Sequence, residues 1–373
     1  MLTFEVDPAA LFEERHRQFV SWGIPARTVE RARNEITDMW GGHRGSWTTV
    51  WGRLAEEAEA EGRLLRAAHL WGAARFPVLA APERLAAYER QRVCYLKAAA
   101  RFPIRFERRT LDLPLNDGPL PLPVHLMARR GRRRPGVVVI SGGVDTWKVE
   151  LHRMAVATAL ATGLLVMVID MPGTGECPLP LTADSDRVLA ALVALIRRQR
   201  PGEPVAYLGV SFGGHWAVKL AMQGVVDAAV SLGAPTGAAG ETDVLALPYG
   251  MPGIIANALH LEAEPDAATA ADLFTRFSLR DQGLLDTPGG APLLAVNGDE
   301  DQYIPRGDTT ALASRPGTTV WLVRGATHCA VERVRPVLLG VWGWLLPRLG
   351  AAPAGAETLL ALPLRRHVSV RSG

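Results

Sequence analysis

Cysteine is scarce in this sequence. Three cysteines occur among 373 residues, at Cys94, Cys177 and Cys329, and neither their odd number nor their spacing fits a disulfide framework or a metal site. A chain with so few cysteines suits a reducing compartment. We therefore expect a cytoplasmic protein without a cysteine-bound metal.

Long apolar runs and a strong excess of one charge are also missing. No run reaches the length of a membrane span, and residues 1–7 lack the basic start and apolar centre of a signal peptide. The formal net charge is only +3, and the basic runs at 129–134 and 365–367 are short enough to be solvated turns. We therefore predict no membrane association and no nucleic-acid partner.

The composition that remains is that of a globular protein with a large core, because 48% of the residues are hydrophobic and 21% are charged. Before Arg101 the apolar residues recur three and four apart, which is the spacing of amphipathic helices. From Ile104 the period changes to two, and strand-like runs then alternate with helix-like segments. This alternation is typical of a mostly parallel sheet covered by helices on both faces.

The pattern therefore predicts an α/β fold in which an all-helical N-terminal domain precedes a helix-flanked, mostly parallel sheet. A segment between two of the late strands is longer than an ordinary connection and rich in proline and glycine, so we predict an insertion over one edge of the sheet. The boundaries that we expect are residues 1–103 for the helical domain, 104–350 for the α/β domain, about 234–288 for the insertion and 351–373 for a tail.

One strand-to-helix junction carries a catalytic pattern. A strand-like run at 205–210 leads into a helix-like segment, and the junction reads Gly209-Val-Ser211-Phe-Gly213. In a G-x-S-x-G turn the two glycines remove the clashes that would otherwise prevent so tight an approach, and the serine stands at the edge of the sheet. Five letters can match by chance, but the flanking strand and helix favour Ser211 as a nucleophile.

A serine nucleophile needs a basic histidine, which in this type of sheet follows a late strand. The run at 319–323 is such a strand, and His328 lies just beyond it. A surface histidine without a catalytic role is the alternative. Because no other histidine of the chain follows a late strand, we predict that His328 is the base.

The base in turn needs an acid, and the strand-like run at 293–296 leads into Asp299, Glu300 and Asp301. Any of these three can instead be a polar loop residue or a helix cap. We predict that Asp301 is the acid, because it lies four residues before Pro305 in a Gly-x-x-Asp-x-x-hydrophobic-Pro pattern.

Acyl transfer also needs two backbone donors for the developing oxyanion. The N–H of Phe212 is one by its place after the nucleophile, and we expect the other from Val144 or, next, from Gly143 in the loop after the strand at 137–141. The alternative for this loop is an ordinary Gly-Gly turn. For the substrate pocket we expect aromatic surface from three tryptophans that can equally pack the core, Trp40, Trp47 and Trp147.

Together, the motifs at 141–148, 170–176 and 209–214, behind about a hundred helical residues, resemble the α/β-hydrolase superfamily. Within it the chain is similar to the group of FrsA-like esterases, 2,6-dihydroxypseudooxynicotine hydrolase and fungal polyketide-shortening hydrolases. This resemblance implies that the helical domain is a lid, and that the reaction cleaves an ester or a C–C bond beside a ketone. It also implies an auxiliary acid, for which Glu241 is the candidate and a helix cap or solvated loop residue the alternative.

The predicted function is that of a serine hydrolase that needs no metal and no cofactor. It would form an acyl-enzyme with a small-molecule substrate, a bulky aromatic or polyketide-like compound of secondary metabolism. An acyltransferase, thioesterase or cyclase with the same three residues is the main alternative, and a non-catalytic binding protein on a hydrolase scaffold is the other. The sequence leaves a monomer and a homodimer both open.

Overall fold

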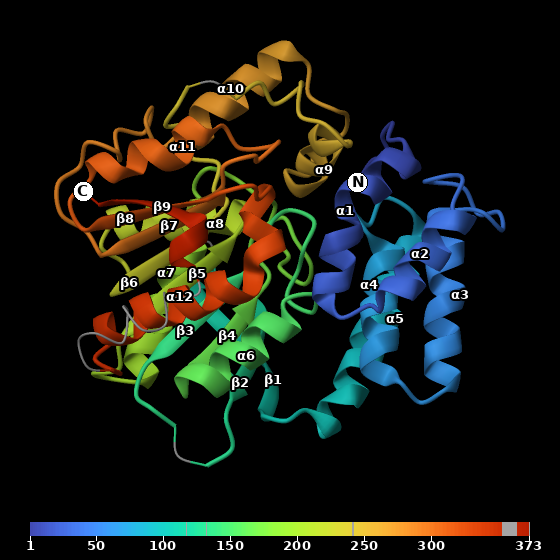
Figure 1. The fold of residues 1–373 in the computed structure, drawn as a ribbon, viewed down its shortest axis with the longest axis horizontal. Helices are drawn as coiled ribbons and strands as arrows, with labels where there is room; N and C mark the ends of the chain where they lie inside the picture. The colour runs from blue at the N-terminus through green and yellow to red at the C-terminus, as the bar shows by residue number, and fades with distance from the viewer. Residues whose placement is uncertain (117, 132, 241, 353–363, 373) are drawn as a thin grey trace.

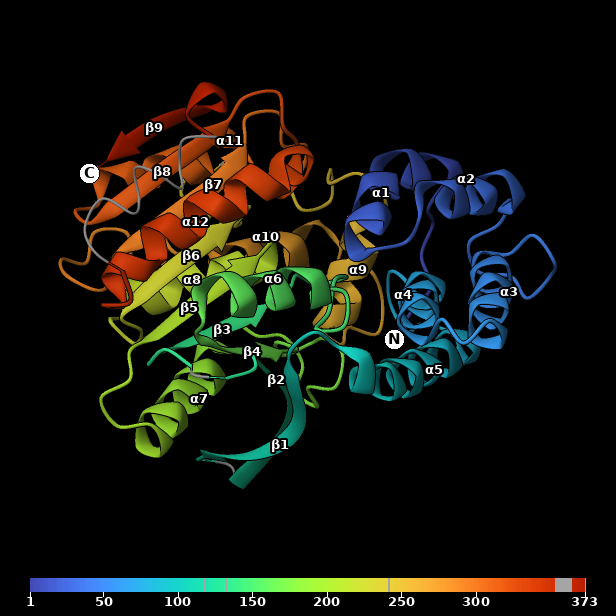
Figure 2. The same ribbon diagram turned by 60° about the horizontal axis from the view of Figure 1, so that its bottom comes forward.

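A layer of N-terminal helices lies beside a helix-flanked sheet, as two views of the computed structural model show (Figure 1, Figure 2). The structure describes residues 1–116, 118–131, 133–240, 242–352 and 364–372. Within these residues no helix has both the length and the apolar character that crossing a bilayer requires.

The N-terminal layer consists of helices whose ends follow local sequence rules. The first helix begins at Pro8, whose missing N–H would have no partner in a first turn, and the Asp7 carboxylate accepts a hydrogen bond from the Ala9 N–H at 2.9 Å. It ends at Gly23, which is left-handed (φ 115°). The elements of the layer are α1 (Pro8–Trp22), α2 (Ala26–Glu35), α3 (Trp47–Ala60), α4 (Leu64–Arg75), α5 (Pro82–Ala98) and the 3-10 turn η1 (Ala99–Arg101).

The described residues form one mixed sheet in the order β1-β2-β4-β3-β5-β6-β7-β8-β9. The pairs β1–β2, β2–β4 and β8–β9 are antiparallel, and every pair between β4 and β8 is parallel. The mostly parallel α/β sheet predicted from the sequence is thus confirmed. Its strands are β1 (Arg105–Leu115), β2 (Gly118–Ala128), β3 (Val137–Ser141), β4 (Leu165–Ile169), β5 (Val205–Val210), β6 (Ala228–Leu232), β7 (Leu293–Gly298), β8 (Thr318–Val323) and β9 (Val368–Ser372).

Both faces of the sheet are buried, which explains why its central strands are continuously apolar. In β3, Val138 and Ile140 belong to the core shared with the N-terminal helices, whereas Val137 and Val139 belong to a second core on the opposite face. The connecting helices and turns are α6 (His152–Thr162), α7 (Asp186–Gln199), α8 (Phe212–Met222), α9 (Met251–Ala258), α10 (Ala267–Phe277), α11 (Arg306–Thr310), η2 (Ala311–Ser314), η3 (His328–Arg333), α12 (Val334–Arg348) and η4 (Arg365–His367).

The end of the expected tail forms part of the sheet. Residues 368–372 make β9, which pairs antiparallel with β8 and covers its outer edge. In the sequence this stretch is a short alternation of valine with polar residues after a basic run, so it was not predicted as a strand. Its pairing partner is about fifty residues upstream, where no local signal indicates it.

The segment before α1 joins the N-terminal layer to α9, which lies over one end of the sheet (Figure 1). The backbone of Leu2 exchanges two hydrogen bonds with the buried side chain of Asn257, at 2.9 and 2.8 Å. The Trp40 indole N–H donates to the Phe4 carbonyl at 2.6 Å. The helical layer is therefore fastened to the insertion as well as to the sheet.

Candidate active site

Ser211 alone makes the turn between β5 and α8. Its backbone has φ 56° and ψ −124°, a strained conformation for a residue with a side chain, and its N–H donates to the Leu232 carbonyl at 2.7 Å. The turn closes because Gly209 has no side chain, since a Cβ there would lie 1.9 Å from the carbonyl oxygen of Gly213. The hydroxyl of Ser211 consequently stands at the carboxyl edge of the sheet.

His328 lies between Ser211 and Asp301 and reaches both. The distance from His328 Nε2 to Ser211 Oγ is 2.9 Å, and that from His328 Nδ1 to Asp301 Oδ2 is 2.7 Å. A carboxylate only accepts, so Nδ1 carries the proton of the neutral ring and Nε2 accepts a hydrogen bond from the serine hydroxyl. The three residues singled out in the sequence thus form one hydrogen-bonded chain, with the geometry required to activate a serine.

Burial and charge act in opposite directions on the two titratable members of this chain. Burial disfavours the charged imidazolium, but the Asp301 carboxylate outweighs it and raises the pKa of His328 well above its usual value. Burial also opposes ionisation of Asp301, yet His328 and hydrogen bonds from the Tyr303 N–H and Asn297 lower the pKa of this carboxyl. The pair therefore keeps a carboxylate beside a strongly basic imidazole.

Asn297 supports the histidine and the acid at once, and it was not predicted from the sequence. Its Nδ2 donates to Asp301 Oδ2 at 2.8 Å, and its Oδ1 accepts from the backbone N–H groups of Gly298 and Cys329 at 2.9 and 3.1 Å. The side chain is buried at the end of β7. The only signal for its role in the sequence is a polar residue at the end of an otherwise apolar strand.

The loop after β3 passes directly beside the nucleophile. A Cβ on Gly143 would lie 2.8 Å from the Ser211 Cβ, so only a glycine lets the backbone come this close. Val144 and Phe212, the two residues predicted to donate to an oxyanion, both line the cavity that contains Ser211. The structure therefore places Val144, Phe212 and the alternative candidate Gly143 beside the nucleophile.

Buried charges fix this loop from the far side. Asp170, at the end of β4, accepts from the Lys148 N–H at 2.8 Å and forms an ion pair with the Lys148 ammonium, which also lies 2.8 Å from Glu176. Arg75 of α4 lies 2.9 Å from Glu150, and both side chains are fully buried. The motif at 170–176 therefore anchors the loop.

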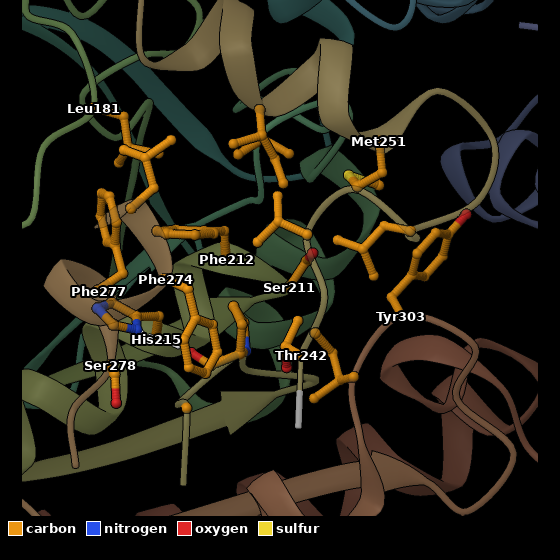
Figure 3. A pocket seen from close by; sticks show the side chains of 18 of the residues that line it. Leu181, Ser211, Phe212, His215, Thr242, Met251, Phe274, Phe277, Ser278 and Tyr303 are labelled. Atoms are coloured by element: carbon orange, nitrogen blue, oxygen red, sulfur yellow. Dashed lines mark hydrogen bonds between the residues drawn. The ribbon is translucent and has the colours of Figure 1, made fainter. Parts of the chain in front are cut away.

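Ser211 and His328 open into an apolar cavity of about 110 Å³, which exceeds many times the roughly 10–15 Å³ that one water needs. Figure 3 shows Phe212, Phe274 and Phe277 on one side of Ser211 and Tyr303 on the other. Most of the wall comes from the insertion at 234–288, through its loop and the helices α9 and α10. The cavity is lined by Val144, Leu181, Ser211, Phe212, His215, Pro235, Gly237, Thr242, Val244, Leu247, Met251, Ile255, Leu259, Leu273, Phe274, Phe277, Ser278, Tyr303, Ile304 and His328.

The three tryptophans expected in the pocket do not line this cavity, and that expectation is wrong. Trp47 is fully buried, with its indole N–H bonded to the Ala73 carbonyl at 2.7 Å. The guanidinium of Arg75 lies over the Trp147 ring, 3.6 Å from the ring centre, and the guanidinium of Arg84 lies over the Trp40 ring. Their aromatic area therefore serves packing, and among the residues that the structure describes before Val144 none contributes to the cavity wall.

The remaining candidates have other positions. Glu241, the proposed auxiliary acid, lies outside the described residues. Asp299 accepts from the Gly325 N–H at 2.8 Å and so ties together the loops after β7 and β8. Cys329, the residue after His328, does not line the cavity, and its thiol donates to the Leu232 carbonyl at 3.1 Å. Over the described part of the chain, no three His, Cys, Asp or Glu side chains are grouped as a metal would require.

Comparison with known proteins finds relatives that cover most of the chain. A family model described as "Esterase FrsA-like" matches residues 13–322. The curated Esterase FrsA of Vibrio vulnificus strain YJ016 is 24% identical over 322 residues, which are 78% of this chain and 74% of the relative. Esterase FrsA of Escherichia fergusonii is 27% identical over 333 residues, with 83% and 77% covered.

Two solved structures share the fold over most of their length. AbyA5 superposes with a TM-score of 0.75 at 24% identity, covering 95% of this chain and 99% of that one. The 2,6-dihydroxy-pseudo-oxynicotine hydrolase superposes with a TM-score of 0.69 at 21% identity, covering 89% and 95%. At these identities the likeness concerns the fold: an α/β-hydrolase sheet with helices ahead of it.

Proposed function

The chain belongs to the FrsA-like esterase family, and from this premise we propose that Ser211 is its nucleophile, His328 its base and Asp301 the acid that orients the base. Membership makes the protein an α/β-hydrolase-type esterase. The observation that supports these roles is the unbroken chain of hydrogen bonds, 2.9 and 2.7 Å long, from the serine hydroxyl to the carboxylate.

The proposed reaction begins when His328 Nε2 takes the Ser211 proton while Oγ bonds to the substrate carbonyl carbon. The carbonyl electron pair moves to the oxygen, which the N–H groups of Phe212 and Val144 stabilise. As the bond to the leaving alcohol breaks, His328 gives that alcohol its proton. Water then attacks the acyl carbon, transferring a proton to His328, and the serine leaves with that proton.

The substrate that we propose is an ester with a bulky, apolar acyl group, aromatic or polyketide-like. Three phenylalanines and a series of aliphatic side chains face the cavity beside Ser211, and an apolar acyl group would bury its surface against them. His215, the other histidine of the wall, is uncharged near neutral pH because burial lowers its pKa to about 4. A charged acyl group would find no ion-pair partner there.

Between an ester and a ketone-adjacent C–C bond, we favour the ester. Cleaving a C–C bond leaves a carbanion-like centre that an acid must protonate, whereas an alcohol leaves more easily. Among the described residues of the cavity wall no Asp or Glu is present to act as that acid.

Labelling with a fluorophosphonate, followed by intact mass, tests the proposed roles. We expect one adduct on the wild type and none on Ser211→Ala, with His328→Ala reacting at least about a hundredfold more slowly because the base is gone. The steady-state rate of hydrolysis of p-nitrophenyl esters should fall in the same two variants, and by similar factors, at every acyl length tested. Retention of adduct and turnover by well-folded Ser211→Ala would refute the mechanism.

A further inference from the structure

One face of α1 contacts three of the loops that carry or support the proposed machinery. Its side chains, Glu14, Arg15, Arg17 and Gln18, belong to the N-terminal helical layer, whereas the loops follow β3, β7 and β8 of the sheet. We call these four residues the clamp face. None of them lines the cavity, so their contacts are with the machinery's supports and not with a substrate.

The strongest of these contacts is with the loop after β3. Arg15 Nη2 lies 3.1 Å from Asp145 Oδ2, and both side chains are almost completely buried, 6% and 7% exposed. Beside this pair, Gln18 Nε2 donates to the Thr146 hydroxyl at 2.6 Å, and that hydroxyl donates to Asp145 Oδ1 at 3.0 Å. The carboxylate next in sequence to Val144 is therefore held by a cation from another layer of the protein.

The same arginine also touches the loop that carries the acid. Its guanidinium lies 5.2 Å from the centre of the Tyr303 ring. The backbone N–H of Tyr303 donates to Asp301. Glu14, next to the arginine, accepts from Gln302 Nε2 at 2.8 Å. Figure 3 shows the Tyr303 hydroxyl pointing away from Ser211 toward the N-terminal helices.

The loop of the histidine is reached through a more exposed pair. Arg17 Nη1 donates to Glu332 at 2.9 Å, and Glu332 accepts from the N–H and hydroxyl of Thr327, the residue before His328, at 3.0 and 2.7 Å. Because the Arg17 side chain is 57% exposed, this contact is screened by water and contributes little.

We propose that Arg15 is a positioning residue: through its ion pair with Asp145 it holds the Val144 N–H at the place where the oxyanion forms. This inference rests on the proposed function. A backbone donor acts only within hydrogen-bond distance of the oxyanion, and a displacement of about 1 Å can cost about a hundredfold in rate. Without Arg15, the Asp145 carboxylate is left buried without its cation, and it relaxes toward water, taking Val144 with it.

A second anchor makes the proposal testable without loss of the fold. Arg75 Nη1 donates to the Asp145 backbone carbonyl at 2.9 Å, independently of Arg15. We therefore expect Arg15→Met to shift the loop and not to unfold it. Asp145→Asn removes the ion pair from the other side while keeping the size of the side chain, so it decides the question if Arg15→Met does not fold.

The experiment compares wild type, Arg15→Met and Asp145→Asn with Arg27→Met, an exposed arginine of α2, as the control. We expect kcat for a p-nitrophenyl ester to fall about 10–100-fold in the two test variants, with KM changed less than about threefold, because the donor acts in the transition state. The acid limb of the pH profile should stay where it is, since the pair His328–Asp301 is intact. Arg27→Met should match the wild type.

Unchanged kcat in folded Arg15→Met or Asp145→Asn overturns the inference. A shifted acid limb also overturns it, because the arginine would then act through the acid loop and not through Val144. Neither result affects the proposed function, whose own test is the labelling and ester hydrolysis of the wild type, Ser211→Ala and His328→Ala.

Discussion

The Asp301 carboxylate determines both the tautomer and the basicity of His328. It fixes the tautomer of His328, and it raises the pKa of that ring against the effect of burial. The active form of the base is the neutral ring, so the rate rises with pH as His328 loses its proton. In the wild type that rise should therefore occur above pH 6.5, the usual pKa of histidine.

Asp301→Asn tests this dependence. We expect kcat to fall about 10³–10⁴-fold, because an amide no longer holds the required tautomer. The residual activity should have its acid limb at lower pH than the wild type, because burial then lowers the pKa of His328 with no carboxylate to oppose it. The measurement is kcat/KM against pH for both proteins. An acid limb that stays in place, or moves upward, would show that another group titrates.

Single residues also show how far the sequence could predict the site. Ser211, Asp301 and His328 were found because each follows a strand, and strand ends of a parallel sheet meet at one edge. Asn297 was missed because its role depends on Asp301 and Cys329, which lie on two different loops. Arg15 was missed for the same reason: its partner Asp145 is 130 positions away in the sequence.

At the scale of elements, the insertion at 234–288 forms most of the cavity wall. The apolar residues Leu273, Phe274 and Phe277 of α10 face the cavity, and Ala270 is the one residue of this helix that is buried. The apolar side of this helix therefore forms part of the cavity wall. The length of the segment between β6 and β7 is visible in the sequence, but which of its side chains face Ser211 depends on how the segment folds back.

Phe274→Ala should change which acyl chain fits best. Removing the ring enlarges the cavity, so longer acyl chains gain buried surface, about 0.8 kcal/mol or about fourfold in kcat/KM per methylene. Short acyl chains, which lose the contact with the ring, should be hydrolysed less efficiently. The check is kcat/KM along a series of p-nitrophenyl esters, with the exposed Thr275→Ala as control. An unchanged ratio of long to short esters would place the acyl group elsewhere.

The tryptophans illustrate why side-chain composition is a poor guide to a pocket at this scale. Trp40 and Trp47 flank a glycine-rich break, which in the sequence favoured exposed aromatic surface. Trp47 instead begins α3, where its ring lies 4.9 Å from that of Phe12 and 6.2 Å from that of Phe76 in a fully buried cluster. Burial of this kind depends on contacts between helices, which periodicity does not specify.

At the scale of the whole molecule, buried uncharged histidines connect its layers. His69 of α4, His125 of β2 and His152 of α6 lie among aromatic rings between the N-terminal helices and the sheet, and the Tyr95 hydroxyl lies 2.9 Å from His152 Nδ1. Burial lowers the pKa of His69 to about 3, that of His152 to about 4, and that of His125 well below its usual value.

Lowering the pH should therefore destabilise the protein already at pH values above those at which its carboxylates become protonated. The pKa values of these histidines are lower in the folded state than in the unfolded state, so the unfolded chain binds protons first as the pH falls. The free energy of unfolding therefore decreases below about pH 6.5, by about 2 kcal/mol per histidine at about pH 5. Urea unfolding at the two ends of this range measures the loss. His69→Gln should reduce the loss, and the exposed His43→Gln should not. Equal losses in all three proteins would contradict the assignment.

The strained turn at Ser211 has a consequence for how this protein would evolve or be engineered. A left-handed serine destabilises the fold by about 1–3 kcal/mol relative to a residue suited to that conformation, and glycine is such a residue. Ser211→Gly would thus make the protein more stable but catalytically inactive. Selection for heat tolerance alone would favour that loss, and the serine is retained only where turnover is selected too.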